Sequence, residues 1–167
     1  MVTTQPSTNY AANQTTEAKD TTYTNTTNKP AATVYNTIVV DINTADSLAL
    51  LAVKGIGPTF AGRIVKYRNL LGGFTNKEQL AEVYGFADKY DGVKDQIKAS
   101  AGHKRINLNT ATFKEMNKHP YIKYELTKAI FNLKKKLGTF KAVDDIKQID
   151  LVTDELYNKL APYLTVQ

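Results

Sequence analysis

Residues 51–74 read LAVKGIGPTFAGRIVKYRNLLGGF, and this stretch decides the fold. Gly55 and Gly57 stand one residue apart, between two segments that read as amphipathic helix. Glycine adopts positive φ without steric cost, so the pair predicts a tight hairpin. Pro58 follows at the position where a helix begins and where its missing N–H group does no harm. We therefore predict a helix over residues 58–71, ended by Gly72 and Gly73.

An internal repeat extends this unit over the rest of the chain. A shift of 66 residues places Asn43-Thr44-Ala45 on Asn109-Thr110-Ala111, Ile64 on Ile130 and Phe74 on Phe140. A constant offset of this kind indicates two copies of one supersecondary unit. The predicted organisation is a tail over residues 1–36, a first domain over 37–102 and a second domain over 103–167.

Each copy reads as short helices only, so the predicted fold class is all-α. Asn43 and Asn109 are predicted to be N-cap residues that each open a helix. The run Thr75-Asn76-Lys77-Glu78 has the form of a capping box, and Thr153 is a further predicted cap. Only residues 34–42 look extended.

The composition excludes several classes of protein. The net charge of +6 and the pI of about 9.3 permit a nucleic-acid partner without requiring one. The absence of cysteine excludes disulfides, thiolate metal sites and cysteine nucleophiles. No apolar run is long enough to span a membrane. Residues 1–36 contain eleven Thr and five Asn, and we expect them to form a disordered spacer.

The glycine hairpin is also the sharpest candidate for a binding site. Without side chains at Gly55 and Gly57, an anion can approach the backbone closely. The first N–H groups of the following helix have no partner inside the helix and carry the positive end of its dipole. A phosphate fits such a site, although a Gly-x-Gly pair alone is equally compatible with a plain tight turn. The candidate phosphate-binding residues are Lys54, Gly55, Ile56, Gly57, Thr59, Arg63, Lys66 and Arg68.

The stretch resembles the helix-hairpin-helix motif in its ComEA-like form, found in competence DNA receptors. The matching residues are Gly55, Ile56, Gly57, Pro58, Ala61, Ile64, Tyr67, Arg68, Gly73 and Phe74, preceded by Ile42-Asn43-Thr44-Ala45. The two-copy arrangement, with His119-Pro120-Tyr121-Ile122 in the second hairpin, resembles helix-hairpin-helix proteins of Bacteroidetes-type bacteria. The resemblance implies two tandem helix-hairpin-helix domains, built as bundles like those of SAM domains.

The resemblance also implies a function and a location. It implies binding of double-stranded DNA without sequence specificity, along the phosphate backbone, in DNA uptake. It implies a candidate site for a monovalent cation between hairpin carbonyls and a phosphate; no other cofactor is expected. Competence receptors carry an N-terminal membrane anchor, so an extracytoplasmic or periplasmic location is expected if an anchor or signal was removed, and a cytoplasmic one otherwise. We expect a monomer with no small-molecule substrate and no membrane span in this chain.

The second copy departs from the pattern. Tyr121 and Lys123 stand where the first hairpin has Gly55 and Gly57, which argues against an anion site there. Yet residues 103–167 hold twelve Lys and Arg against seven Asp and Glu. Two interpretations stay open: the second copy is a structural prop with solvated lysines, or its lysines extend a DNA footprint by electrostatics. The candidate secondary basic surface comprises Lys123, Lys134, Lys135 and Lys136.

No catalytic constellation is found in the sequence. His103 and His119 lack suitably spaced acidic partners, so neither is expected to bind a metal or act in catalysis. The acidic pairs Asp144-Asp145 and Asp154-Glu155 are explained by positions near helix starts. No phosphate-binding P-loop or nucleophile elbow occurs. We therefore expect a protein that is not an enzyme.

Three functions compete. The first is a module that binds duplex DNA. The alternative is a structural or protein-interaction module with the same fold and no DNA ligand, which the altered second hairpin favours. For Arg63, Lys66 and Arg68 this alternative means an ordinary solvated helix face. The third is an accessory domain of a nuclease or helicase, which is the weakest because no catalytic region is present.

Overall fold

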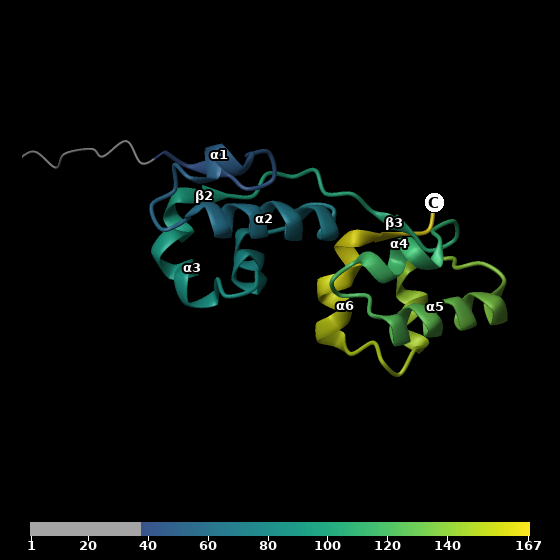
Figure 1. The fold of residues 1–167 in the computed structure, drawn as a ribbon. Helices are drawn as coiled ribbons and strands as arrows, with labels where there is room; N and C mark the ends of the chain where they lie inside the picture. Colours follow the sequence, from purple (N-terminus) through teal and green to yellow (C-terminus); the bar gives the residue numbers. More distant parts are fainter. Residues whose placement is uncertain (1–37) are drawn as a thin grey trace, which may run out of the picture. The chain divides into compact units, whose positions relative to one another are not determined.

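The computed structural model describes residues 38–167. The predicted tail over residues 1–36 lies outside the described residues. Both copies of the repeat belong to one compact unit. The described chain is mainly helical, and this confirms the predicted all-α class (Figure 1).

The first copy is built around one long helix. Its elements in order are β1 (Val40–Asp41), α1 (Ser47–Leu50), α2 (Pro58–Leu71), the 3₁₀ helix η1 (Lys77–Glu82), α3 (Ala87–Val93), the 3₁₀ helix η2 (Lys94–Gln96) and β2 (Ile97–Lys98). Helix α2 has the predicted bounds, because Pro58 opens it and Gly72 ends it in the left-handed conformation at φ 84°.

The second copy repeats this order. Its elements are β3 (Ile106–Asn107), α4 (Phe113–Lys118), α5 (Tyr124–Leu137), the 3₁₀ helix η3 (Val143–Gln148), α6 (Asp154–Leu160), the 3₁₀ helix η4 (Ala161–Tyr163) and β4 (Leu164–Thr165). Helix α5 lies 66 residues after α2 at both ends, whereas α6 begins 67 residues after α3. One residue is therefore inserted between η3 and α6, where Thr153 caps α6 as predicted.

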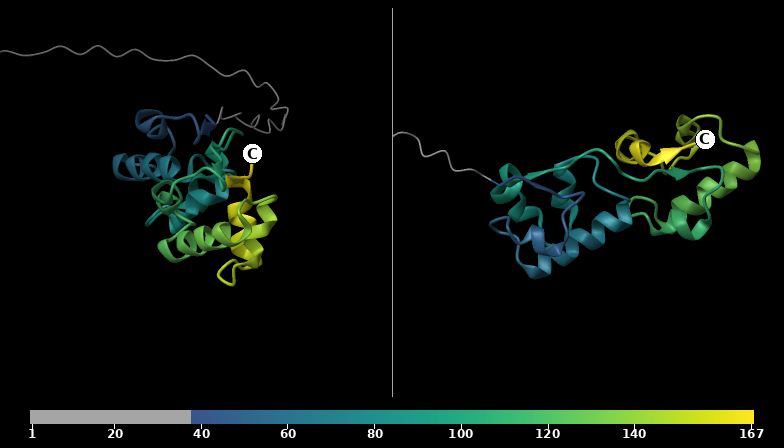
Figure 2. Two further views of the ribbon diagram at one scale, coloured as in Figure 1. Left: turned by 90° about the vertical axis from the view of Figure 1, so that its right-hand side faces the viewer. Right: turned by 90° about the horizontal axis from the view of Figure 1, so that it is seen from above.

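Two short parallel strand pairs supplement the helices, and the sequence did not predict them. Strand β1 pairs with β2, and β3 pairs with β4, two residues each (Figures 1 and 2). Each pair joins the beginning of a copy to its end. Two-residue strands carry too short a pattern to be recognised by alternation of polar and apolar residues.

Three predicted caps were assigned to the wrong residues. Asp46 and Thr112, rather than Asn43 and Asn109, are the N-caps of α1 and α4. The capping box of η1 begins at Asn76, whose side chain accepts from Gln79 N–H, one residue later than predicted. Asn43 instead bridges distant backbone: its amide nitrogen donates to the Phe74 and Ser100 carbonyls, and its oxygen accepts from Phe74 N–H at 2.8 Å.

Two hydrophobic clusters form the core. One gathers buried residues of the first copy, including Ile42, Ile64, Phe74 and Phe86, and the other gathers those of the second copy. Tyr163 of the second copy belongs to the first cluster, where it is fully buried. Its hydroxyl donates to the Gly73 carbonyl at 2.9 Å and lies 2.9 Å from Gln79 Nε2.

Candidate nucleic-acid interface

The first hairpin joins α1 to α2 and is fixed by hydrogen bonds to Val53 and Gln96 and by the buried Ile56 side chain. Ile56 N–H donates to the Val53 carbonyl at 3.0 Å, and the buried Ile56 side chain anchors the turn in the core. Gln96 holds the other side, because Lys54 N–H donates to its side-chain oxygen at 3.0 Å. Gly55 adopts φ 109°, as its predicted role in a tight turn requires.

Several backbone donors of this hairpin are free. Within residues 38–167, the N–H groups of Gly55, Gly57, Thr59 and Phe60 have no hydrogen-bond partner. Gly57 is the N-cap of α2 and offers no side-chain cap, and the first turn contains no acidic residue. These donors lie at the positive end of a 14-residue helix, so the hairpin can hold an anion.

The two glycines serve different purposes. A Cβ atom on Gly57 would meet nothing within 4 Å, so the space in front of this residue is open. A Cβ atom on Gly55 would lie 3.1 Å from Val93 Cγ1, at a φ that side chains rarely adopt. Gly55 is therefore required by the fold, whereas Gly57 leaves room for a ligand.

The predicted cations of the hairpin and of α2 have distinct surroundings. Lys54 and Lys66 are exposed, as is Thr59. Arg63 is half-buried, and its Nη1 donates to the Tyr84 carbonyl at 3.0 Å. The Nη1 of Arg68 donates to the carbonyls of Ile42 and Ala45, at 3.0 and 2.5 Å. This geometry favours a structural role for Arg68 over the predicted phosphate contact.

Arg63 is also part of an aromatic cluster that the sequence did not reveal. Its guanidinium carbon lies 5.1 Å from the centre of the Tyr84 ring and 5.4 Å from that of Phe60. Lys89 Nζ lies 5.5 Å from the Phe60 ring centre. Tyr84 is 82% exposed, more than any other large hydrophobic or aromatic residue described. No local pattern signals this cluster, since Tyr84 follows η1, distant in sequence from α2.

The second hairpin keeps the turn, and of the four equivalent N–H groups only that of Tyr121 has a partner within residues 38–167; those of Lys123, Glu125 and Leu126 are free, but side chains stand in place of both glycines and Glu125 puts an acidic residue in the first turn of α5. Ile122 N–H donates to the His119 carbonyl at 2.9 Å, as Ile56 does to Val53 in the first hairpin. Tyr121 N–H, at the position of Gly55, faces His119 Nδ1 at 3.3 Å. The Tyr121 hydroxyl donates to Glu82 and lies 2.9 Å from Gln79 Nε2. The altered hairpin thus packs on the first copy.

Burial at this contact shifts the pKa of one histidine and of two tyrosines. His119 is 3% exposed, and burial lowers the pKa of its imidazole to about 4. Burial raises the pKa of the Tyr67 and Tyr121 hydroxyls, and the hydrogen bonds that both make to the Glu82 carboxylate raise it further. These groups keep one protonation state at neutral pH, which suits a structural contact.

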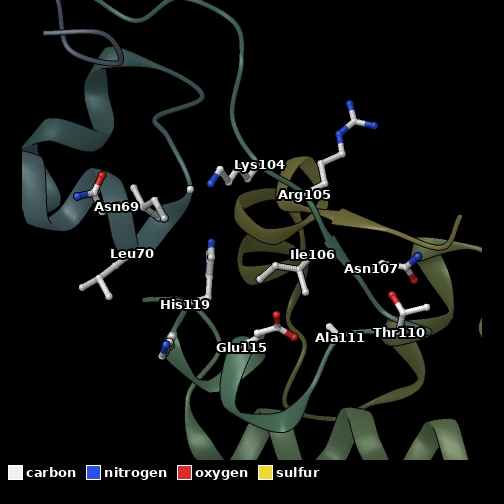
Figure 3. A pocket seen from close by; sticks show the side chains of 13 residues that line it. Asn69, Leu70, Lys104, Arg105, Ile106, Asn107, Thr110, Ala111, Glu115 and His119 are labelled. Atoms are coloured by element: carbon white, nitrogen blue, oxygen red, sulfur yellow. The ribbon is translucent and has the colours of Figure 1, made fainter.

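The predicted secondary basic surface is divided between structure and solvent. Lys134 Nζ donates to the Asn109 carbonyl, in the position that Arg68 has in the first copy. Lys123, Lys135 and Lys136 are exposed. A polar groove of about 660 Å³ has further cations in its lining, Lys104, Arg105 and Lys118, which were not predicted (Figure 3).

Within residues 38–167, no helix is long and apolar enough to cross a membrane, and no cluster of three or more His, Asp or Glu residues is placed to hold a metal ion.

Comparison with known proteins supports the motif. The family model described as the helix-hairpin-helix motif matches residues 35–92 and 102–165, which together exceed half of the chain. No solved structure gives a significant match.

Relatives were found among vertebrate and bacterial proteins. The chain is 27% identical over 151 residues to the endonuclease/exonuclease/phosphatase family domain-containing protein 1 of Xenopus laevis, covering 77% of this chain and 27% of that protein. It is 28% identical over 142 residues to the human protein of the same name, covering 66% and 25%. It is 30% identical over 125 residues to the uncharacterized protein YdcI of Bacillus subtilis (strain 168), covering 71% and 16%. The chain spans about a quarter of the length of the vertebrate relatives.

Proposed function

The chain belongs to the helix-hairpin-helix family, a nucleic-acid-binding type, and from this premise we propose that it binds double-stranded DNA through backbone phosphates at the first hairpin. The observation that carries the proposal is the set of free N–H groups at Gly55, Gly57, Thr59 and Phe60, in front of open space at Gly57. Contacts of this kind read no bases, so random-sequence duplexes should bind alike.

Lys54 and Lys66 support the same proposal, because both are exposed beside the hairpin helix. With roughly two to four phosphates neutralised, the log–log salt slope of the affinity should be about −2 to −4. In the second hairpin Tyr121 packs on the first copy and Glu125 lies in the first turn of α5, so we place the phosphate site in the first copy alone.

We further propose that the chain is a binding module and not an enzyme. The vertebrate relatives carry a nuclease-family name, but this chain spans about a quarter of their length. Nothing in the comparisons points to competence, so a role in DNA uptake and the ComEA-like subtype stay predictions of the sequence.

The test is a Gly57→Ala variant of the full chain, measured by fluorescence anisotropy with a random-sequence duplex. The new methyl group enters open space, so the fold should persist, but it obstructs the approach of a phosphate. Losing one charge-assisted hydrogen bond should weaken binding about tenfold or more. Gly92→Ala is the matched control, because its methyl group also meets nothing within 4 Å. If both variants bind the duplex as tightly as the parent does, the first hairpin does not contact the DNA phosphates.

A further inference from the structure

An exposed tyrosine and an apolar hollow lie along α2, beside the proposed phosphate site. Contacts to DNA phosphates alone would not require either feature. Tyr84 is 82% exposed and directly follows Val83, which is buried. A hollow of about 310 Å³ beside Tyr84 has Arg63, Lys66, Tyr67, Leu70 and Val83 as its other lining residues. Apolar atoms form most of this lining, and its charged side chains are both cationic.

The Tyr84 ring is held in place despite its exposure. Arg63 Nη1 donates to the Tyr84 carbonyl at 3.0 Å, and the Arg63 guanidinium carbon lies 5.1 Å from the ring centre. Phe60 supports Arg63 in turn and packs edge-on against the buried Phe86, with 5.3 Å between ring centres. Gly85, at φ 74°, leaves room for the guanidinium, because a Cβ atom there would lie 3.3 Å from Arg63 Nη1.

The hollow lies along the helix that begins at the proposed phosphate site. At about 1.5 Å of rise per residue, Arg63 and Lys66 lie roughly 6 and 10 Å beyond Thr59 along α2. One strand of a duplex rises about 3.4 Å per nucleotide, so this span corresponds to a few nucleotides. A strand held at the hairpin can therefore continue past Arg63 and Lys66.

Resting on the proposed function, we infer that the Tyr84 ring stacks an unpaired nucleobase of the bound strand, so that the protein prefers duplex DNA that borders a single-stranded nucleotide. Bases within an intact duplex are stacked on each other and present no free face. An aromatic face beside cations is the arrangement by which proteins hold unpaired bases. The two cations of the hollow favour a polyanion over a neutral apolar peptide.

The test compares the full-length parent with Tyr84→Ala on two labelled DNAs: a blunt duplex, and the same duplex with a short single-stranded overhang. The parent should prefer the overhang DNA. Tyr84→Ala should lower affinity for that DNA about tenfold and leave affinity for the blunt duplex within about twofold. Tyr84→Phe, which keeps the ring, should retain the preference. Tyr124→Ala, which removes an exposed tyrosine of the second copy, is the matched control and should retain it too.

A direct readout places 2-aminopurine in the overhang, where its fluorescence should fall on binding to the parent and not to Tyr84→Ala. An equal loss on both DNAs would show that the ring acts only by placing Arg63, and would overturn the inference. If the parent binds both DNAs equally, the stacking inference is wrong but the proposed function still holds. An acidic protein would then be the next partner to test for the hollow. A parent that binds neither DNA would overturn both.

Discussion

At the scale of single residues, Arg68 and Lys66 of α2 have different roles because their surroundings differ. The Arg68 guanidinium donates to two carbonyls at the beginning of the first copy, and Lys134 donates to one carbonyl, that of Asn109, at the beginning of the second. Lys66 is exposed, as a phosphate contact requires. The 66-residue repeat already pairs Arg68 with Lys134, and a cation kept at both positions indicates a structural role.

Lys66→Ala and Arg68→Ala should therefore separate binding from stability. Lys66→Ala should flatten the salt slope by about 1 and change the free energy of unfolding by less than about 0.5 kcal/mol. Arg68→Ala should lower that free energy by about 2 kcal/mol, because two carbonyls lose their donor. Urea denaturation and anisotropy titrations on both variants measure the two effects. If Arg68→Ala folds but binds DNA more weakly than Lys66→Ala does, Arg68 contacts the phosphate as the sequence predicted.

At the scale of elements, one asparagine in each copy joins the beginning of the copy to the loop after its long helix and to its end. Asn43 bonds Phe74 twice and Ser100 once, and Asn109 bonds Phe140 twice and Val166 once. The asparagine amide suits this place because one side chain both donates and accepts.

Asn43→Asp should destabilise the protein by about 2–4 kcal/mol, as measured by urea denaturation. The carboxylate can still accept from Phe74 N–H, but it faces the Phe74 and Ser100 carbonyls without a proton to donate. Asn69→Asp, on the exposed face of α2, is the matched control and should change stability by less than about 0.5 kcal/mol. Equal effects of the two variants would show that the Asn43 bridge is not needed.

Local signals in the sequence predicted the elements that depend on them. Pro58, Gly72 and the apolar spacing of α2 act within a few residues, and the helix has the predicted bounds. The roles of Asn43 and Tyr84 depend on contacts 21 to 57 residues away along the chain. Residue type alone cannot fix such contacts: Asn43 is a good helix cap by propensity, but tertiary hydrogen bonds outweigh that role.

At the scale of the whole molecule, the two hairpins have different roles, because the second one packs on the first copy. The first hairpin has glycines at both exposed positions, whereas the second places Tyr121 against Glu82 and buries His119 beside Tyr163, with 4.9 Å between the ring centres. The equivalent of His119 in the first copy is the buried Val53. Replacing valine by histidine puts a titratable group into the contact between the copies, which makes the stability of the molecule depend on pH.

The sign of this dependence follows from the lowered pKa of His119. Its pKa falls from 6.5 to about 4 on folding, so the unfolded chain takes up the proton first as the pH decreases. The contribution of neutral His119 is complete above pH 6.5 and is lost between there and pH 4, by at most about 3 kcal/mol.

Chemical denaturation of the parent and of His119→Gln across this range should show a smaller decrease in the free energy of unfolding for the variant. The carboxyls of Asp41, Glu115 and Asp144, whose pKa values are also lowered, destabilise both proteins in acid and cancel in the difference. His103→Gln is the matched control, because it removes the other histidine and leaves His119 in place. If His119→Gln and the parent lose stability in parallel from pH 6.5 to 4, the imidazole is not buried in the neutral form, and the second hairpin does not pack on the first copy as described.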